Sequence, residues 1–466
     1  MYKFICSAFL FTTSFILQMN ITNAQATYTM PSEELQHEGT WLQWPHHYEY
    51  GTTYRNRLDA TWVAMTKALV ASEKVHLIVY DATEKTRVQN LLTAASVATT
   101  NIDFFQFPTN DVWVRDNGPI FVRDTSGKLI IQDWGFNGWG GDYNFNLCNP
   151  IPTSVANALA MTVVNLNSTM VNEGGAVEMD GNGVLMTTKS AILCQSNPAN
   201  INAIRNIGMT QAQAETIFQQ YLGVSKFIWL DGFYSVDDIT DAHIDGFARF
   251  ANGTHLVTMS TTDLTYWGLS TTDISLLTSA TDINNKAYTI TQLPLTQNDV
   301  TTAYGKNLGY KGSYINYYVA NSVVLVPNYS DPNDATANAI IQGLYPTRTV
   351  VGIDVRNLYE NGGMVHCVTQ QQPVATASVG LKNFTSPKNN ITISQNPTND
   401  FLKIVSNDEL HNAVIKILNA NGQLIFEKQN QNGKQFQIDL SKQAAGIYFI
   451  EVQSSTNIYR NKIVKE

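Results

Sequence analysis

The sequence predicts a large α/β domain followed by a small all-β sandwich. Over roughly 350 residues, apolar residues at helical spacing alternate with short apolar runs of strand type. After a polar, proline-containing segment, the remaining roughly 75 residues contain only short β-rich runs divided by turn residues. Repeated helix-then-strand units fit either an open sheet or a ring of α/β modules.

The α/β pattern runs from about Pro31 to Val379 and contains three clear helix-then-strand units. In the first, Leu58, Trp62 and Met65 lie at helical spacing, as does Leu69. A strand is expected after them at 75–80. The other two units are 212–221 with 227–230, and 335–344 with 350–353.

The composition changes after Gly380. Residues 383–390 form a polar linker, and Asn421-Gly422 between two β-rich runs is a strong hairpin signal. The expected strands are 401–405, 413–418, 423–426, 436–440 and 446–452. This tail has no cysteine and only one histidine, His411, so we expect no chemistry there.

The N-terminus has the pattern of a secretory signal peptide. Lys3 precedes an apolar stretch over 4–17, and small residues follow near Ala24. No other stretch approaches the ~20 apolar residues that a membrane-spanning helix needs. We therefore expect a signal peptide at 1–24 and a soluble, exported protein.

The formal charge of −9 argues against nucleic acid and anionic membranes as partners. Removing the signal peptide removes Cys6 and leaves Cys148, Cys194 and Cys367. An odd number of cysteines in an exported protein leaves at least one thiol unpaired. Cys148 and Cys194 could form a disulfide, whereas Cys367 is expected to be free.

Four residues in segments rich in Gly and Pro combine a thiol, an imidazole and two carboxylates: Cys367, His243, Asp116 and Asp245. A guanidinium carbon resists water because delocalisation over three nitrogens stabilises it. A thiolate can displace ammonia and leave a covalent amidino intermediate, while a histidine moves protons. Carboxylates hold the planar cation by paired hydrogen bonds. The set therefore favours a hydrolase of C–N bonds in guanidino compounds.

Each residue also has a plainer interpretation. Asp116 precedes Gly118-Pro119 and could simply form a turn. His243 and Asp245 are two apart, so on a strand both would face one site. On the same reasoning His366 and Cys367 would face opposite ways, which leaves His366 out of the predicted site. Carboxylates near Cys367 would raise its pKa, an effect that a bound guanidinium would reverse.

Several motifs resemble the agmatine deiminase and Porphyromonas-type peptidylarginine deiminase family of the guanidine-modifying pentein superfamily. They are Met30-Pro-Ser-Glu-Glu34, His37-Glu-Gly-Thr-Trp-Leu-Gln-Trp-Pro45, Trp113-Val-Arg-Asp-Asn-Gly-Pro119, Trp134-Gly-Phe-Asn-Gly-Trp-Gly-Gly141, Asn172-Glu-Gly-Gly-Ala-Val-Glu-Met-Asp-Gly181, Asp241-Ala-His-Ile-Asp245, Gly362-Gly-Met-Val-His-Cys367 and the segment ending Gln-Gln-Gln-Pro373. The resemblance implies a five-bladed α/β propeller around a central site without metal or organic cofactor.

The resemblance also implies individual roles. Cys367 corresponds to the nucleophile and His243 to the general acid and base. Asp116 and Asp245 correspond to the guanidinium clamps, and Glu173 to a further core carboxylate. Two weaker assignments for substrate binding are Trp113, as a wall of the slot, and Asp238, as a polar contact.

The tail resembles the C-terminal sorting domain of the type IX secretion system. The matching pieces are Ile393-Ser-Gln-Asn-Pro-Thr398, Ile417-Leu-Asn-Ala-Asn-Gly-Gln423 and Ala445-Gly-Ile-Tyr-Phe-Ile-Glu-Val452, with Lys462 and Lys465 near the end. The resemblance implies passage across the outer membrane by the type IX machinery and a secreted or cell-surface location. The expected division is a signal peptide at 1–24, a catalytic domain at 25–380, a linker at 381–392 and a sorting domain at 393–466.

The expected reaction is the conversion of agmatine to N-carbamoylputrescine with release of ammonia. The segment from Trp134 to Gly141 has no arginine to hold a peptide carboxylate. Export favours the alternative, a deiminase of peptidyl or free arginine that makes citrulline. Ala242 and Asn361 stand where the family usually has Gly, so either could reshape the slot. A cysteine protease, a zinc site with no familiar ligand spacing, and a non-catalytic binding protein are the remaining alternatives.

Overall fold

The computed structural model describes residues 26–193, 205–235, 238–375, 391–394, 396–419, 424–453 and 458–466. It divides the chain into two compact units, Met1–Ser378 and Val379–Glu466. The expected signal peptide, Cys194 and most of the expected linker lie outside the described residues. No helix in the described part of the chain is long and apolar enough to cross a membrane.

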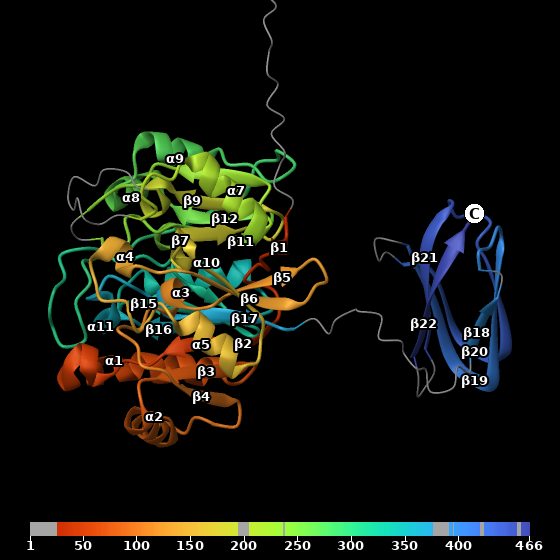
Figure 1. Cartoon of the computed structure of the whole chain (residues 1–466), viewed down its shortest axis with the longest axis horizontal. Coiled ribbons are helices and arrows are strands. Elements are labelled where there is room, and N and C mark those ends of the chain that lie inside the picture. Colours follow the sequence, from red (N-terminus) through yellow and green to blue (C-terminus); the bar gives the residue numbers. More distant parts are fainter. Residues whose placement is uncertain are drawn as a thin grey trace, which may run out of the picture. The chain divides into compact units, whose positions relative to one another are not determined.

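The described strands of the first unit form five small sheets (Figure 1). In sheet order, the first holds β1 (Tyr28–Thr29), β5 (Ile120–Asp124), β6 (Leu129–Gly135) and β7 (Val163–Val171), and the second holds β10 (Lys226–Leu230), β9 (Val184–Thr188) and β8 (Val177–Met179). The third holds β11 (Ala248–Asn252), β12 (His255–Met259) and β13 (Thr289–Leu293). The fourth holds β14 (Tyr318–Val319), β15 (Val323–Asn328) and β16 (Thr349–Asp354), and the fifth holds β17 (Gln370–Pro373), β2 (His37–Gln43), β3 (Lys74–Val79) and β4 (Ile102–Gln106).

The same pairing recurs in all five sheets. An antiparallel pair, such as β5 with β6 or β8 with β9, is followed by a parallel neighbour, β7 or β10 respectively. In the fifth sheet β17, from the end of the unit, pairs with β2 from its beginning. This pairing brings the segment that follows Cys367 beside the N-terminal part of the unit.

Helices connect these strands. They are α1 (His47–Leu69), α2 (Ala82–Ala94), α3 (Val114–Asn117), α4 (Gly138–Gly141), α5 (Ile151–Ala158), α6 (Lys189–Ile192), α7 (Gln211–Leu222), α8 (Thr261–Trp267), α9 (Thr271–Thr278), α10 (Asp334–Leu344) and α11 (Arg356–Tyr359). Three 3-10 turns are η1 (Gly174–Ala176), η2 (Ile244–Gly246) and η3 (His366–Val368).

The three predicted helix-then-strand units are confirmed as α1 with β3, α7 with β10, and α10 with β16. The apolar stripe of α1 is fully buried, because Leu58, Trp62, Met65 and Leu69 are all 0% exposed. A capping box of Thr210 and Gln213 starts α7. Each side chain accepts the backbone N–H of the other residue, at the end of the helix where N–H groups lack a carbonyl four residues earlier in the helix.

The second unit is all-β, as predicted. Its strands are β18 (Ile391–Ser394), β19 (Phe401–Asn419), β20 (Leu424–Asp439), β21 (Gly446–Gln453) and β22 (Ile458–Lys465). They form one nearly closed five-stranded sheet rather than two separate sheets. The strands β19 and β20 pair antiparallel, and the residues of the expected turn, Asn421-Gly422, lie outside the described residues.

The expected short strands of the second unit are longer in the structure. The segments 401–405 and 413–418 both belong to β19, and bulges in its pairing with β20 separate them. A bulge leaves a polar stretch within one continuous strand, so the polar residues between the two apolar runs do not end the strand.

Candidate active site

The five predicted catalytic residues lie on one short helix and three 3-10 turns. They are Asp116 in α3, Glu173 just before η1, His243 just before η2, Asp245 within η2, and Cys367 within η3. The helix α3 contacts η1 and η3, and η1 contacts η2. The expectation that His243 and Asp245 lie on a strand is wrong, because a 3-10 turn carries Asp245.

Gly175 marks the point where these elements converge. A methyl group added at Gly175 would lie 2.7 Å from Nδ1 of His243, 2.8 Å from Oδ1 of Asp116 and 3.1 Å from Oδ2 of Asp245. These three side chains therefore meet around one point, and only glycine leaves room for them there. A Glu-Gly-Gly sequence is equally typical of a hairpin, so sequence alone does not identify this feature.

His243 is buried between two carboxylates. Its Nε2 lies 2.7 Å from Oε2 of Glu173, and its Nδ1 lies 3.6 Å from Oδ1 of Asp116. Burial alone would lower the pKa of His243, but the facing charges of Asp116 and Glu173 raise it to about 9. At neutral pH this histidine is therefore a proton donor.

Asp116 receives hydrogen bonds from two neutral donors. Trp139 Nε1 donates to its Oδ2 at 3.0 Å, and the backbone N–H of Gly175 donates to its Oδ1 at 3.1 Å. Burial, and after it the charges of Glu173 and Asp245, raises the pKa of Asp116 to about 6 although His243 opposes the shift. The carboxylate is charged at neutral pH but easier to protonate than an ordinary aspartate.

The helix that presents Asp116 has a local anchor. Oδ1 of Asp111 accepts hydrogen bonds from the backbone N–H of Trp113 and from Nδ2 of Asn117, both at 2.8 Å. A side chain at Gly118 would meet the carbonyl oxygen of Val114 at 2.1 Å, so glycine is required where the helix ends. The turn expected from Gly118-Pro119 is thus a short helix held at both ends.

Cys367 is partly exposed, and its thiol faces Asn316. Sγ lies 3.5 Å from Oδ1 of Asn316, which also accepts the backbone N–H of Cys367 at 3.3 Å. Burial, followed by the charges of Asp245 and Asp116, raises the pKa of Cys367 well above its ordinary value. The unliganded site therefore holds a neutral thiol.

His366 belongs to the site, contrary to the expectation from sequence. Because η3 is a 3-10 turn and not a strand, the ring of His366 points into the buried network. Its Nδ1 lies 2.7 Å from Oδ2 of Asp245, and its Nε2 lies 2.8 Å from Oε2 of Glu33. Burial alone would raise the pKa of Asp245, but the hydrogen bond and the charge of His366 lower it.

A buried arginine that the sequence analysis missed holds Glu173. Arg205 Nε donates to Oε1 of Glu173 at 2.7 Å, and its guanidinium also donates to Oδ2 of Asp241 at 2.6 Å. Burial alone would raise the pKa of Glu173, but Arg205 and His243 together lower it. No local sequence signal links Arg205 to a glutamate more than thirty positions away.

Glu33 anchors a second buried group that the sequence analysis missed. It forms ion pairs with Arg115 at 3.2 Å and with Arg249 at 3.0 Å, and it accepts the backbone N–H of Val319 at 2.9 Å. The available signal was the motif Met30-Pro-Ser-Glu-Glu34, which carried the family resemblance without a role for its glutamates.

The ring of Trp113 lies close to the backbone at Gly363, four residues before the predicted nucleophile. It is 7% exposed, and a methyl group added at Gly363 would lie 2.0 Å from its ring. The ring therefore needs glycine at this position. This contact is compatible with the expected role of Trp113 as a wall of the slot.

Asp238 is engaged in the loop that leads to His243. Its Oδ1 accepts the N–H and hydroxyl of Thr240 at 2.9 and 2.6 Å, and its Oδ2 accepts the N–H of Ala242 at 3.0 Å. These bonds give Asp238 a clear part in shaping the loop. The expected contact between Asp238 and substrate stays a prediction.

The two positions that depart from the family pattern differ in environment. Ala242 is 1% exposed and has a φ of 66°, a left-handed conformation that favours glycine. Asn361 is exposed, and its Nδ2 donates to the hydroxyl of Tyr54 at 2.6 Å. Ala242 therefore holds a backbone conformation that is more strained for alanine than for glycine. Asn361 ties the loop before Cys367 to α1.

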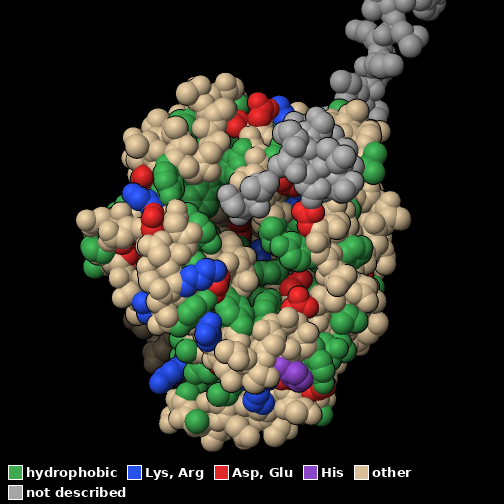
Figure 2. Space-filling view, turned by 90° about the vertical axis from the view of Figure 1, so that its left-hand side faces the viewer, with side chains coloured by type: hydrophobic (Ala, Val, Ile, Leu, Met, Phe, Trp, Pro, Cys, Tyr) green, Lys and Arg blue, Asp and Glu red, His purple; other side chains and the backbone are tan. Residues whose placement is uncertain are grey.

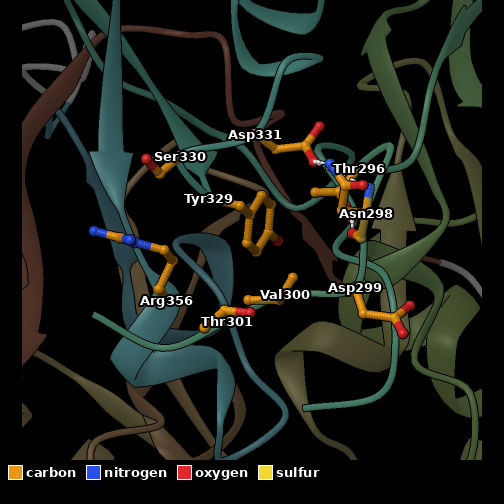
Figure 3. A pocket seen from close by; sticks show the side chains of 9 residues that line it. All are labelled: Thr296, Asn298, Asp299, Val300, Thr301, Tyr329, Ser330, Asp331 and Arg356. Carbon is orange, nitrogen blue, oxygen red and sulfur yellow. Dashed lines mark hydrogen bonds between the residues drawn. The ribbon is translucent and has the colours of Figure 1, made fainter. Parts of the chain in front are cut away.

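Figure 2 shows the side of the first unit on which Figure 1 places α4, α8 and α11. This face is hollowed near its centre, where acidic and basic side chains lie among hydrophobic ones. A separate cavity of about 190 Å³ lies beside Tyr329, Asp331 and Arg356 (Figure 3). Two of its charged groups already have partners, since Asp331 accepts the backbone N–H of Gln297 and Arg356 pairs with Asp354.

The predicted site is an anionic slot with one thiol. Within the described ranges, no group of three or more His, Cys, Asp or Glu side chains is placed to hold a metal ion. The expectation that the protein needs no cofactor stays a prediction. The arrangement can hold a cation between Asp116 and Asp245, present a sulfur to it and deliver a proton from His243.

Comparisons with known proteins match both units. Residues 29–373 match the family model described as Porphyromonas-type peptidyl-arginine deiminase, and residues 395–466 match the secretion system C-terminal sorting domain. An agmatine deiminase of Pseudomonas aeruginosa is 30% identical over 370 residues, which cover 74% of this chain and 95% of the relative.

Two solved structures share the architecture of the first unit. A Porphyromonas gingivalis protein assigned as an arginine deiminase has a TM-score of 0.62 and 31% identity, with 75% of this chain and 98% of that chain covered. The agmatine deiminase of Enterococcus faecalis has a TM-score of 0.64 and 25% identity, with 74% and 96% covered. The first unit therefore has the pentein fold.

Proposed function

Because this chain belongs to the Porphyromonas-type peptidyl-arginine deiminase family and is a hydrolase of amidine C–N bonds, we propose that Cys367 attacks a guanidinium carbon directly. The substrate that we propose is agmatine, which becomes N-carbamoylputrescine while ammonia leaves. Deimination of peptidyl or free arginine to citrulline is the second candidate.

The observation that carries this proposal is the convergence of side chains at Gly175. One point lies near His243, Asp116 and Asp245 at once, with the thiol of Cys367 on the adjoining turn η3. A protease needs a thiol and an imidazole but gains nothing from two further carboxylates. A planar cation uses both of them, because each can accept its N–H groups.

The atoms and protons balance with these residues and solvent water. Cys367 releases its thiol proton to solvent when the guanidinium binds. Sγ then forms a bond to the guanidinium carbon, the C–N bond breaks, and ammonia leaves with a proton from His243. Water then loses a proton to His243 and adds to the same carbon. The S–C bond breaks, which releases the ureido product and restores the thiol.

The substrate's charge assists ionisation of Cys367. In the empty site, burial and the charges of Asp245 and Asp116 raise the pKa of this thiol. A bound guanidinium neutralises that negative field and places a positive charge beside the sulfur. A neutral urea lacks this charge, so the site discriminates against its own product.

Agmatine fits the charged groups better than free arginine. Free arginine and a peptide C-terminus bring a carboxylate that needs a cationic partner. The buried arginines near the site, Arg115, Arg205 and Arg249, are already paired with Glu33, Glu173 and Glu178. The motif from Trp134 to Gly141 contains no arginine that could bind such a carboxylate. An internal arginine of a peptide avoids this conflict and remains the stronger rival.

We also propose that the five sheets are the blades of a five-bladed propeller, in which β17 closes the ring onto β2. The sorting domain supports a secreted or cell-surface location reached through the type IX machinery. A signal peptide at 1–24 would supply the first export step.

Ammonia release from agmatine, free arginine and an arginyl peptide, measured side by side, tests the proposed substrate. We expect the highest kcat/KM with agmatine and no activity in Cys367→Ser. Higher kcat/KM with the peptide would select the second candidate, and no release from any guanidine would overturn the proposal.

A further inference from the structure

His366 is the immediate neighbour of Cys367, and its ring is buried between two carboxylates. It is 2% exposed, and both ring nitrogens lie within 2.8 Å of carboxylate oxygens, one from Asp245 and one from Glu33. Carboxylate oxygens only accept, so each of these hydrogen bonds needs an N–H on the ring.

We propose that His366 is a positioning residue for the guanidine reaction, which binds Oδ2 of Asp245 and so directs the other oxygen of that carboxylate at the substrate. This inference rests on the proposed function, because it assigns to Asp245 the task of holding the guanidinium.

The two oxygens of Asp245 have different surroundings. Oδ2 is bound to Nδ1 of His366 at 2.7 Å, whereas no hydrogen bond from the described residues reaches Oδ1. A carboxylate that rotates freely would lose orientation each time the slot empties. With Oδ2 held, Oδ1 keeps one direction before substrate arrives, and less entropy is lost on binding.

The other side of His366 is fixed to the scaffold. Glu33, which accepts from Nε2, is itself held by the guanidinium groups of Arg115 and Arg249. The ring therefore transmits the position of a rigid, ion-paired glutamate to Asp245. A residue that merely filled space would not need carboxylates at both nitrogens.

The backbone of His366 is tied to the same assembly. Oδ1 of Asn316 accepts the N–H of His366 at 2.9 Å, while Nδ2 of Asn316 donates to the carbonyl of Asp245 at 3.3 Å. The turns that carry the thiol and the clamp are thus joined through Asn316 as well as through the ring. The position of Cys367 is therefore coupled to that of Asp245.

Two substitutions separate the two contacts of the ring. The amide nitrogen of asparagine occupies about the position of Nδ1, and that of glutamine about the position of Nε2. His366→Asn therefore keeps a donor for Asp245 and loses the one for Glu33, whereas His366→Gln does the reverse. Each variant removes one hydrogen bond to a carboxylate, so each is the control for the other.

We expect His366→Gln to lower kcat/KM for agmatine roughly 10- to 100-fold, because it loses a hydrogen bond to a charged group. His366→Asn should stay within about tenfold of the parent, because it keeps the donor to Asp245 and loses only the one to Glu33. In a Cys367→Ser background, the Kd for agmatine should rise in the Gln variant more than in the Asn variant. Equal Kd values in the two variants, or weaker binding of agmatine by the Asn variant than by the Gln variant, would overturn the inference.

A double-mutant cycle tests whether His366 acts through Asp245. The Kd change caused by His366→Gln should largely disappear when Asp245 is already Asn, since coupled residues are not additive. Full additivity would contradict the positioning role. If the parent neither binds nor turns over any guanidine, the proposed function fails instead, which is a different result.

A further test keeps His366 in place and so does not depend on the stability of a His366 variant. In Cys367→Ser with isotope-labelled histidine, agmatine should shift the ring signals of His366 while those of His411, in the second unit, stay in place. Unchanged His366 signals at saturating agmatine would show that the ring does not respond to the slot and would overturn the inference.

Discussion

Asp116 and Asp245 have similar positions around the slot but different partners. Asp116 is bound by the neutral indole of Trp139, and its pKa is raised to about 6, chiefly by burial. Asp245 is bound by His366, which lowers its pKa. Neighbouring carboxylates with separated pKa values take different roles. In the proposed mechanism, Asp245 would be the permanently charged clamp, and Asp116 would respond more strongly to the charge of a ligand.

Asp116→Asn should weaken both binding and catalysis. The amide keeps the size of the carboxylate but removes its charge, and its N–H₂ group can face the N–H groups of the substrate. Losing a charge-assisted, largely desolvated contact costs on the order of 2–4 kcal/mol, or roughly 30- to 1000-fold in kcat/KM. His243→Gln is the matched comparison and should lose mainly kcat. If Asp116→Asn left kcat/KM unchanged, this carboxylate would have a structural role only, and the protease interpretation would have to be reconsidered.

The pH dependence should differ between the free and the occupied enzyme. Without substrate the pKa of Cys367 is raised, so only a small fraction of the thiol is ionised at neutral pH. We therefore expect kcat/KM to rise with pH as this fraction grows. A bound guanidinium lowers the pKa of the thiol, so the acid limb of kcat should lie lower by about one pH unit or more, or about 1.4 kcal/mol of interaction. Initial rates across pH at low and saturating agmatine measure both limbs. Coincident acid limbs would mean that substrate does not assist ionisation.

Sequence reasoning named the candidate reactive side chains but not the groups that hold them. The side chains of His243, Asp116 and Asp245 meet around Gly175, and the charges of Asp245 and Asp116 raise the pKa of Cys367. Glu33, Arg205 and His366 have partners far away in the chain, so no spacing rule connects them. His366 was also assigned to the wrong geometry, since a 3-10 turn was taken for a strand.

At the scale of elements, the loop before His243 combines strain with strong anchoring. Asp241 and Ala242 both have left-handed backbones, with φ of 56° and 66°. Their carbonyls accept hydrogen bonds from the hydroxyls of Ser190 and Thr188, at 2.7 and 2.9 Å. Strained conformations persist where surrounding contacts fix them. These hydrogen bonds hold the strained backbone that leads directly to His243.

Ala242→Gly should be far better tolerated than an ordinary buried Ala→Gly change. It relieves a left-handed alanine, a conformation that costs about 1–2 kcal/mol. Ala337, fully buried inside α10, is the control, because glycine there costs about 1 kcal/mol in helix propensity. Both variants lose one buried methyl group. The free energies of unfolding from denaturant melts should therefore differ by about 2 kcal/mol in favour of Ala242→Gly. Equal losses would show that the loop is not strained.

Long elements were predictable where periodicity was strong. The stripe of Leu58, Trp62, Met65 and Leu69 repeats over three turns and gave α1 correctly. The short helix α3 and the 3-10 turns hold too few residues to show a period, and tertiary contacts such as those of Asp111 define them instead. The strand β19 was split in the prediction because bulges interrupt its apolar alternation.

At the scale of the whole molecule, the catalytic chemistry and the export signal occupy separate units. All predicted catalytic residues lie within Met1–Ser378, and the sorting domain lies within Val379–Glu466. Each described unit has its own buried core, which in the second includes Leu402, Ile415 and Ile450. The first unit should therefore work without the second.

The exported form should show this division. Mass spectrometry of cell-free medium should find a protein that begins near Gln25 and ends near the linker at 383–390, with full deiminase activity. A chain truncated after Ser378 should keep the same kcat/KM. Residue 1 intact in the medium, or a truncated chain without activity, would contradict this account.

In the proposed reaction, Cys367 becomes covalently bound to the guanidinium carbon. Enzyme turning over agmatine should be quenched in acid, digested and weighed by mass spectrometry. We predict that the peptide containing Cys367 gains the mass of agmatine less one ammonia, and that the Cys367→Ser protein shows neither this gain nor ammonia release. Steady ammonia release from the parent with Cys367 unmodified at every quench time, or undiminished release by Cys367→Ser, would contradict the account.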